Sequence, residues 1–89
     1  MDIEKKIKYQ SKRGFLELDF FLSDFVAKEC SKLTKNEKQS LLDLLNIDDM
    51  VLLEILQKKH KPYGQYKKII SLIEAFNEKN KDGNFKSIL

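Results

Sequence analysis

Apolar side chains recur at helical spacing between residues 15 and 33. One stripe occupies positions i, i+3, i+4, i+7 and i+8, which are Leu18, Phe21, Leu22, Phe25 and Val26. Three further apolar residues, Phe15, Leu16 and Phe20, fall outside this stripe. A helix that is apolar on several faces is either covered on more than one side or keeps part of its surface exposed for a partner. We therefore expect other helices to pack around this one.

The composition favours the same class of fold. The 89 residues include only three glycines and one proline, and the abundant Leu, Lys and Glu favour helices over strands. A chain of this length forms one domain. We predict an all-α fold, a small compact bundle of four to five helices with short connections. Residues 1–79 are expected to form this single helical domain, and residues 80–89 a loose C-terminal tail.

One predicted helix precedes the apolar one in the sequence, and another follows it. Residues 2–12 form the first, which carries few apolar side chains and should be the most weakly docked. The third opens at Thr34 with Glu37 three positions later, the pattern of a capping box. The leucines at 41–45 give it a broad apolar face.

The last two helices are predicted at 49–59 and 65–79. Asp48 is expected to cap the fourth helix, with Asp49 in its first turn, where acidic side chains suit the positive end of the helix dipole. The 60–64 segment contains Pro62 and Gly64, which should end that helix.

Charge and cysteine content narrow the class of protein. The net charge is +3, carried by sixteen lysines and a single arginine, Arg13, among fourteen acidic residues. Such a mild balance does not by itself indicate a nucleic-acid-binding protein. A lone cysteine, Cys30, allows no intrachain disulfide and fits a reducing compartment. The N-terminus does not resemble a signal peptide, and no apolar run is long enough to span a membrane, so we expect a cytoplasmic protein.

Residue patterns of catalysis are absent from the sequence. There is no Gly-rich phosphate loop, no H-E-x-x-H motif and no cluster of Cys and His. His60 is interpreted as a solvated residue at a helix C-terminus, and Cys30 as a packed, inert thiol. The acidic pairs Glu17/Asp19 and Asp48/Asp49 lack the flanking groups of an acid–base site. We therefore expect no enzymatic activity, no bound metal and no cofactor.

The segment from Lys12 to Asp19 is the unusual local cluster. In one interpretation Gly14 forms a turn, Glu17 and Asp19 decorate a helix start, and Arg13 is a solvated neighbour. In the other, the segment is an exposed recognition patch. Gly14 would let a partner's backbone come close, Arg13 would offer a bidentate guanidinium, and Glu17 would accept hydrogen bonds.

Arg13, Gly14, Glu17 and Asp19 follow a pattern, R-G-x-x-E-x-D, that resembles the R-G-x-x-E signature of the SdhE family, the flavinators or assembly factors of succinate dehydrogenase. Asp48 to Leu52 is similar to the D-D-x-x-L element of that family. The resemblance extends over about residues 5–77 and includes Phe25, the 34–45 segment and Lys61-Pro62. Departures are Ile55, which stands where family members often have tryptophan, and Tyr9, which stands where some relatives have it. A contact that specifically used an indole would be lost.

The resemblance implies a function and a set of site residues. Members bind the flavoprotein subunit of succinate dehydrogenase, in some bacteria that of fumarate reductase, and promote its covalent FAD attachment. Carried over by position, Arg13, Gly14 and Glu17 would contact the partner, Asp19 would support them, and Phe15 with the first helix would form the rim. The free protein is expected to be a monomer.

Two other functions stay open at this point. One is a nucleic-acid-binding or antitoxin-type regulatory module, against which the lysines are dispersed and interleaved with acids. The other is a generic helical adaptor that would use the basic segment 58–61 on an acidic partner.

Overall fold

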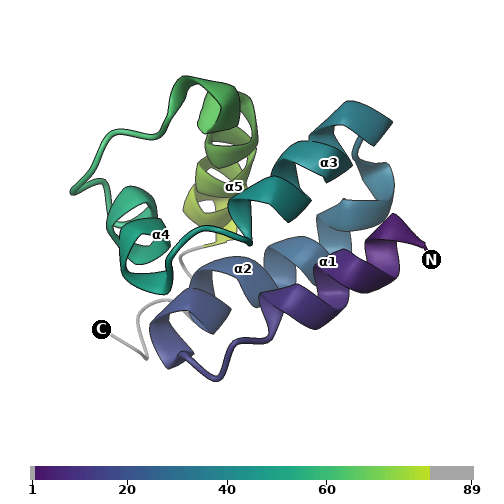
Figure 1. Ribbon diagram of the computed structural model, residues 1–89, viewed down its shortest axis with the longest axis horizontal. Helices are drawn as coiled ribbons and strands as arrows, with labels where there is room; N and C mark the ends of the chain where they lie inside the picture. The colour runs from purple at the N-terminus through teal and green to yellow at the C-terminus, as the bar shows by residue number, and fades with distance from the viewer. Residues whose placement is uncertain (1, 81–89) are drawn as a thin grey trace.

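The computed structural model describes residues 2–80, and this part of the chain is helical without any strand. Figure 1 shows the α-helices packed into one compact body. The prediction of an all-α bundle is confirmed. None of the described helices is long and apolar enough to cross a membrane. The elements are α1 (Ile3–Ser11), α2 (Leu16–Glu29), η1 (Cys30–Lys32), α3 (Lys35–Leu44), α4 (Asp49–Leu56), η2 (Gly64–Tyr66) and α5 (Lys67–Asn80).

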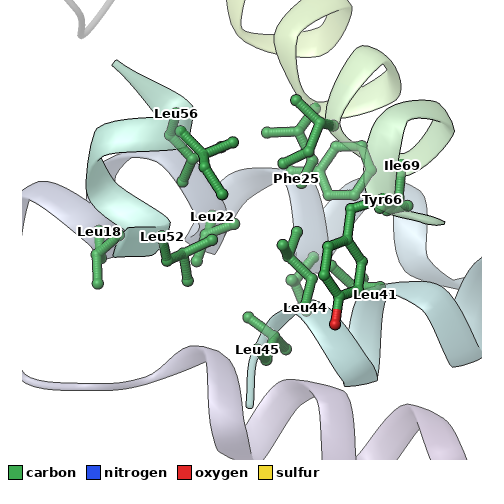
Figure 2. Packing of buried hydrophobic residues seen from close by; sticks show 14 of the residues in the cluster. Leu18, Leu22, Phe25, Leu41, Leu44, Leu45, Leu52, Leu56, Tyr66 and Ile69 are labelled. Carbon is green, nitrogen blue, oxygen red and sulfur yellow. The ribbon is translucent and has the colours of Figure 1, made fainter. Parts of the chain in front are cut away.

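Helix α2 runs through the centre of the bundle and contacts α1, α4 and α5. Its predicted stripe supplies much of the core: Leu18, Leu22, Phe25 and Val26 are buried, and Phe21 packs against them from a half-buried position. Figure 2 shows Leu18, Leu22 and Phe25 of this stripe together with leucines of α3 and α4. Burying a side chain of this size stabilises the fold by roughly 1.5–3 kcal/mol. The rings of Phe25 and Phe76 add an edge-to-face contact at 5.6 Å between centroids.

Helix α1 is better docked than its few apolar residues predict, so that prediction is wrong. Ile7 is fully buried against α2 and α3. Ser11 is buried as well, because its hydroxyl donates to the Lys8 carbonyl 2.9 Å away and so carries no unsatisfied polar atom into the core. The Lys38 ammonium reaches the Glu4 carboxylate at 2.9 Å. That hydrogen bond raises the pKa of Lys38 above its ordinary 10.5.

The predicted starts of α3 and α4 are confirmed at the level of individual caps. The Thr34 hydroxyl accepts from the Glu37 amide at 3.1 Å, and the Glu37 carboxylate accepts from the Thr34 amide at 2.9 Å. Asp48 accepts from the Met50 amide at 2.9 Å. Each contact satisfies a backbone N–H group that has no partner within its helix.

Helix α4 ends at Leu56, three residues before the predicted end, and for a different reason. Lys58 adopts a left-handed backbone with φ of 64°. The Lys59 amide then donates to the Glu54 carbonyl at 2.8 Å and the Lys58 amide to the Ile55 carbonyl at 3.0 Å. This pair of bonds is a Schellman motif, here with lysine where glycine is usual. The tail predicted at 80–89 falls, apart from Asn80, outside the described residues.

Candidate functional site

The predicted site residues lie together in the turn between α1 and α2 and in the first turn of α2. Gly14 sits at the tip with φ of +69°, in the left-handed region that disfavours a side chain. No atom lies within 4 Å of the position where a Cβ would stand. The backbone conformation therefore favours glycine, and the space beside it is open to another chain.

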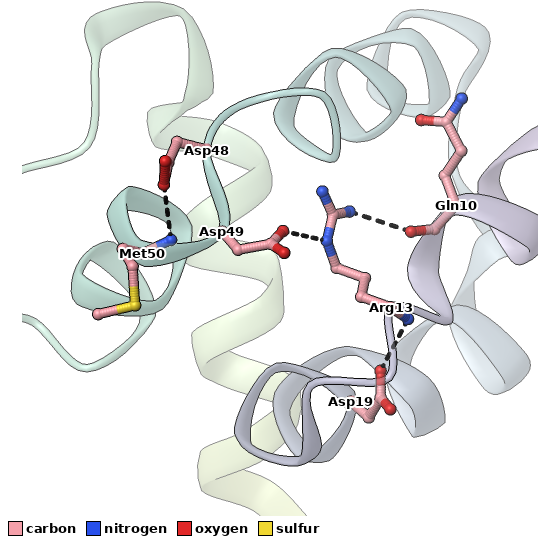
Figure 3. A network of polar contacts seen from close by, with 6 residues as sticks. All are labelled: Gln10, Arg13, Asp19, Asp48, Asp49 and Met50. Atoms are coloured by element: carbon pink, nitrogen blue, oxygen red, sulfur yellow. Dashed lines mark hydrogen bonds and ion pairs between the residues drawn. The ribbon is translucent and has the colours of Figure 1, made fainter.

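Asp19 fixes the shape of this turn. One of its carboxylate oxygens accepts a hydrogen bond from the Arg13 backbone amide at 3.3 Å, as Figure 3 shows. The contact spans six residues and ties the start of the turn to the first turn of α2.

The Arg13 side chain is held within the molecule. Its Nε–H donates to the Asp49 carboxylate at 2.5 Å, and Nη1 donates to the Gln10 carbonyl at 3.0 Å. Only 15% of the side chain is exposed. The interpretation of Arg13 as a solvated charge is therefore wrong, since this guanidinium joins the α1–α2 turn to the first turn of α4 (Figure 3).

Asp49 is the site residue that the sequence analysis missed. The sequence identifies it only as an acidic residue at a helix start, which it also is. Its pairing with Arg13 bridges 36 positions of sequence, so no local pattern could reveal it. The signal that could have found it was the similarity of Asp48 to Leu52 to a family element, because a shared motif outside the core calls for a partner.

Some N–H groups of the Arg13 guanidinium have no hydrogen-bond acceptor among the described residues. A guanidinium carries five N–H donors, of which one on Nε and one on Nη1 are engaged. Among the described residues no group accepts from Nη2, which points away from Asp49 and Gln10 in Figure 3. Three N–H groups, two on Nη2 and one on Nη1, are thus left to donate to a carboxylate or carbonyl.

Arg13 also lines an open hollow of about 530 Å³ beside the turn. Tyr9, 82% exposed, stands at its edge. The remaining lining residues are Gln10, Lys12, Leu45, Asn46 and Asp49.

The first turn of α2 supplies the other exposed groups. Glu17 is exposed and accepts one hydrogen bond, from the Gln57 side-chain amide at 3.3 Å. Phe15 is half-buried against the core, whereas Leu16 is 71% exposed and is the apolar side chain that this turn presents outward. Leu16 is a second residue that the predicted site did not include.

The two residues considered for chemistry lie elsewhere. Cys30 is buried, and this burial raises the pKa of its thiol above the ordinary 9.0, which suits an inert packed side chain. His60 is exposed, and its Nδ1 lies 2.7 Å from the Lys61 carbonyl. Within residues 2–80 no three His, Cys, Asp or Glu side chains gather as a metal site would require. The held arginine, open glycine and exposed glutamate suit recognition of another protein.

Comparison with known proteins points to one family. Residues 5–77 match the family model described as flavinator of succinate dehydrogenase. Three relatives are each named FAD assembly factor SdhE. The one from Coxiella burnetii is 39% identical and covers 82% of this chain and 90% of its own length. The relative from Wigglesworthia glossinidia brevipalpis is 35% identical and covers 83% of this chain and 92% of its own length. The relative from Legionella pneumophila strain Paris is 31% identical and covers 79% of this chain and 89% of its own length. No solved structure matches the chain.

Proposed function

The chain belongs to the family of flavinators of succinate dehydrogenase, and we propose that it binds the flavoprotein subunit of that enzyme and promotes covalent attachment of FAD to it. The observation that carries this proposal is the family match over residues 5–77, a range that contains the whole α1–α2 turn and Asp49. The related flavoprotein of fumarate reductase is the second acceptor to test.

Arg13, Gly14 and Glu17 are assigned the contact with the flavoprotein, with Phe15 at its rim. The free Nη2 edge of Arg13 binds a partner carboxylate or carbonyl, and the open face of Gly14 admits the partner's backbone. Asp19 and Asp49 act indirectly, because they hold the Arg13 backbone and side chain in place before binding. Immobilising a free side chain on binding costs roughly 0.5–1.5 kcal/mol, so a held arginine binds more tightly than a mobile one.

The factor supplies binding energy and no catalytic group in this proposal. A partner that moves between conformations can be shifted toward one of them by any protein that binds this one more tightly. Docking on the α1–α2 turn would stabilise the conformation of the flavoprotein in which its own residues attach FAD. The free energy that shifts the flavoprotein between its two conformations is the difference between the binding free energies of the factor for them.

Glu17→Gln tests the contact with little risk to the fold, since Glu17 is exposed and has a single polar partner. Hydrogen bonds to charged groups contribute about 1.5–3 kcal/mol, so affinity for the flavoprotein should fall roughly tenfold or more. The readout is flavin fluorescence of the denatured subunit in a gel, from cells whose own factor is deleted and replaced by limiting amounts of each variant.

Glu29→Gln is the matched control. It makes the same substitution at the other end of α2, about 18 Å along the helix, at a residue whose side chain likewise has one partner, Lys32 at 3.6 Å. Equal flavin attachment with both variants would contradict the assignment of Glu17. A wild-type chain that restores no flavin attachment to either flavoprotein would refute the proposed function itself.

A further inference from the structure

A groove runs along α1 beyond the turn. The hollow at Arg13 adjoins a second one of about 680 Å³, which is lined by Lys5, Lys6 and Leu42 in addition to shared residues. The two hollows share Tyr9 and Gln10 of α1 and Asn46, which follows α3. The two hollows therefore adjoin along α1 and the end of α3, and together they are called the groove.

The charge along this groove is positive and largely uncompensated. Lys5, Lys6 and Lys12 are exposed, and none of them forms an ion pair with a described residue. The one acidic residue in the lining, Asp49, is already paired with Arg13. A cleft lined by one sign of charge concentrates ligands of the opposite sign and speeds their association. The occupant that suits this groove is therefore acidic.

The groove also offers groups that bind a peptide. Tyr9 is 82% exposed between the two hollows, and exposed tyrosines are enriched among the residues that dominate protein interfaces. The Asn46 amide nitrogen donates to the Leu42 carbonyl at 3.0 Å, which leaves the Asn46 side-chain oxygen to accept from a ligand. An extended backbone laid in the groove could donate an N–H to that oxygen while its side chains meet the lysines.

We propose that this groove binds an extended acidic segment of the flavoprotein, continuous with the contact at the α1–α2 turn. The inference rests on the proposed function and extends it by naming the chemistry of the segment bound. One carboxylate meets the Nη2 edge of Arg13, others meet Lys5, Lys6 and Lys12, and Tyr9 packs on the segment between them. Single-stranded nucleic acid shares the negative charge, but it is favoured by successive aromatic platforms. In the lining of these two hollows Tyr9 is the only aromatic residue.

Charge reversal tests the groove on the flavoprotein. The variant Lys5→Glu/Lys6→Glu places acids in the groove, near the start of α1, where the helix dipole tolerates them. Its control, Lys59→Glu/Lys61→Glu, makes the same change of net charge on the α4–α5 connection, which Figure 1 shows on the opposite side of the molecule from α1. We expect the groove variant to lose about tenfold or more in affinity for the purified flavoprotein subunit, and the control less than about twofold. Equal losses in the two variants, or none in either, would overturn the groove while leaving the contact at Glu17 intact.

A second measurement reads the groove without the flavoprotein. Backbone amide NMR shifts of the isolated protein are followed during titration with hexaglutamate, with hexaglutamine and with a short oligothymidine. The proposal expects shifts at Tyr9, Gln10 and Asn46 with hexaglutamate alone, weakening as salt is added. Shifts spread equally over the lysines at 58–61 would overturn it as unspecific charge attraction, and tighter binding of oligothymidine would overturn it in favour of nucleic acid. Groove-specific shifts in a protein that does not bind the flavoprotein would overturn the flavoprotein as the source of the segment.

Discussion

The turn between α1 and α2 and the connection between α4 and α5 both carry basic side chains, but Arg13 of the first is held by polar contacts and the lysines of the second are not. In the first, Arg13 is 15% exposed and is bound to Asp49 and the Gln10 carbonyl. In the second, Lys58, Lys59 and Lys61 are all exposed, and none forms an ion pair with a described residue. A held charge has one direction and can select a partner geometry, whereas a solvated charge contributes only to the general field of the molecule.

The largest expected effect comes from Arg13→Lys. It keeps the charge but loses the planar guanidinium, which can bind Asp49, Gln10 and a partner at once. We expect affinity for the flavoprotein to fall by roughly 2 kcal/mol, about thirtyfold, with a matching loss of flavin fluorescence on the subunit. Lys61→Gln, which removes a whole charge from the α4–α5 connection, should leave attachment unchanged. A Lys61→Gln loss as large as that of Arg13→Lys would mean that charge alone matters.

Removal of Asp49, the acidic partner of Arg13, should lower the stability of the fold. Asp49→Ala leaves the mostly buried Arg13 guanidinium without its carboxylate. Because the Asp49 side chain is 43% exposed, water screens part of the contact, and we expect a loss of about 1–2 kcal/mol of unfolding free energy. Lys59→Ala should change stability by less than about 0.5 kcal/mol. Urea unfolding of both variants measures the difference, and equal values would show that the Arg13–Asp49 pair contributes nothing.

Gly14 and Gly64, the glycines within residues 2–80, allow the cleanest comparison of backbone conformation. Both have open space where a Cβ would stand, but only Gly14 lies in the left-handed region. Gly14→Ala should therefore cost about 1–2 kcal/mol, and Gly64→Ala should stay within about 0.5 kcal/mol of the wild type. Thermal unfolding distinguishes them. If Gly14→Ala is as stable as the wild type, the turn relaxes to another conformation, and its flavin attachment then shows whether the left-handed tip is needed.

Lys58→Gly should stabilise the protein. Lys58 holds a left-handed backbone that a lysine adopts at a cost and a glycine adopts freely, although glycine loses more entropy on folding. The balance is expected to raise unfolding free energy by about 0.5–1 kcal/mol. The melting temperature, compared with that of Lys59→Gly one residue later, reports it. An unchanged or lower melting temperature for Lys58→Gly would mean that the lysine is held there by contacts that outweigh the strain.

The smallest expected effect concerns another charge held by polar contacts, the Glu37 carboxylate at the start of α3. The Thr34 amide, followed by the Lys68 ammonium, lowers the pKa of the Glu37 carboxyl below its ordinary 4.5. A carboxyl with a lowered folded-state pKa stabilises the fold above its ordinary pKa, and this contribution is lost as pH falls through the folded value. The stability difference between wild type and Glu37→Gln should therefore narrow as pH falls below 4.5. Unfolding measured at intervals from about pH 6 to about pH 3 tests this, and a constant difference would contradict it.

Helix starts were predictable here because caps are local. Thr34 and Glu37 find each other within one turn, and Asp48 reaches an amide two residues away. The end of α4 could not be predicted, because the left-handed residue that ends it is Lys58 and not the glycine that is usual there. The docking of α1 was underestimated, since burial of Ser11 depends on a hydroxyl finding a carbonyl in its own helix.

In the candidate site, too, the local features could be predicted from the sequence and the long-range contact could not. Arg13, Gly14, Phe15, Glu17 and Asp19 were proposed from a motif that is contiguous in sequence, and they occupy the α1–α2 turn and the first turn of α2. What the motif could not contain is the partner that orients its arginine. The pairing with Asp49 depends on how α4 packs against α2, a tertiary contact that no spacing within the motif encodes.

That long-range pairing has a consequence for the order of events during synthesis. A ribosome that has reached Asp19 has already made the complete motif, but the carboxylate that orients Arg13 comes thirty residues later and is useful only once α4 has packed. Small domains acquire their non-local contacts together in one cooperative step. A nascent or partly degraded chain therefore carries the recognition residues without the recognition surface. In the proposed function, competence to engage the flavoprotein would arise only with completion of folding, and an unfinished chain would not occupy that subunit.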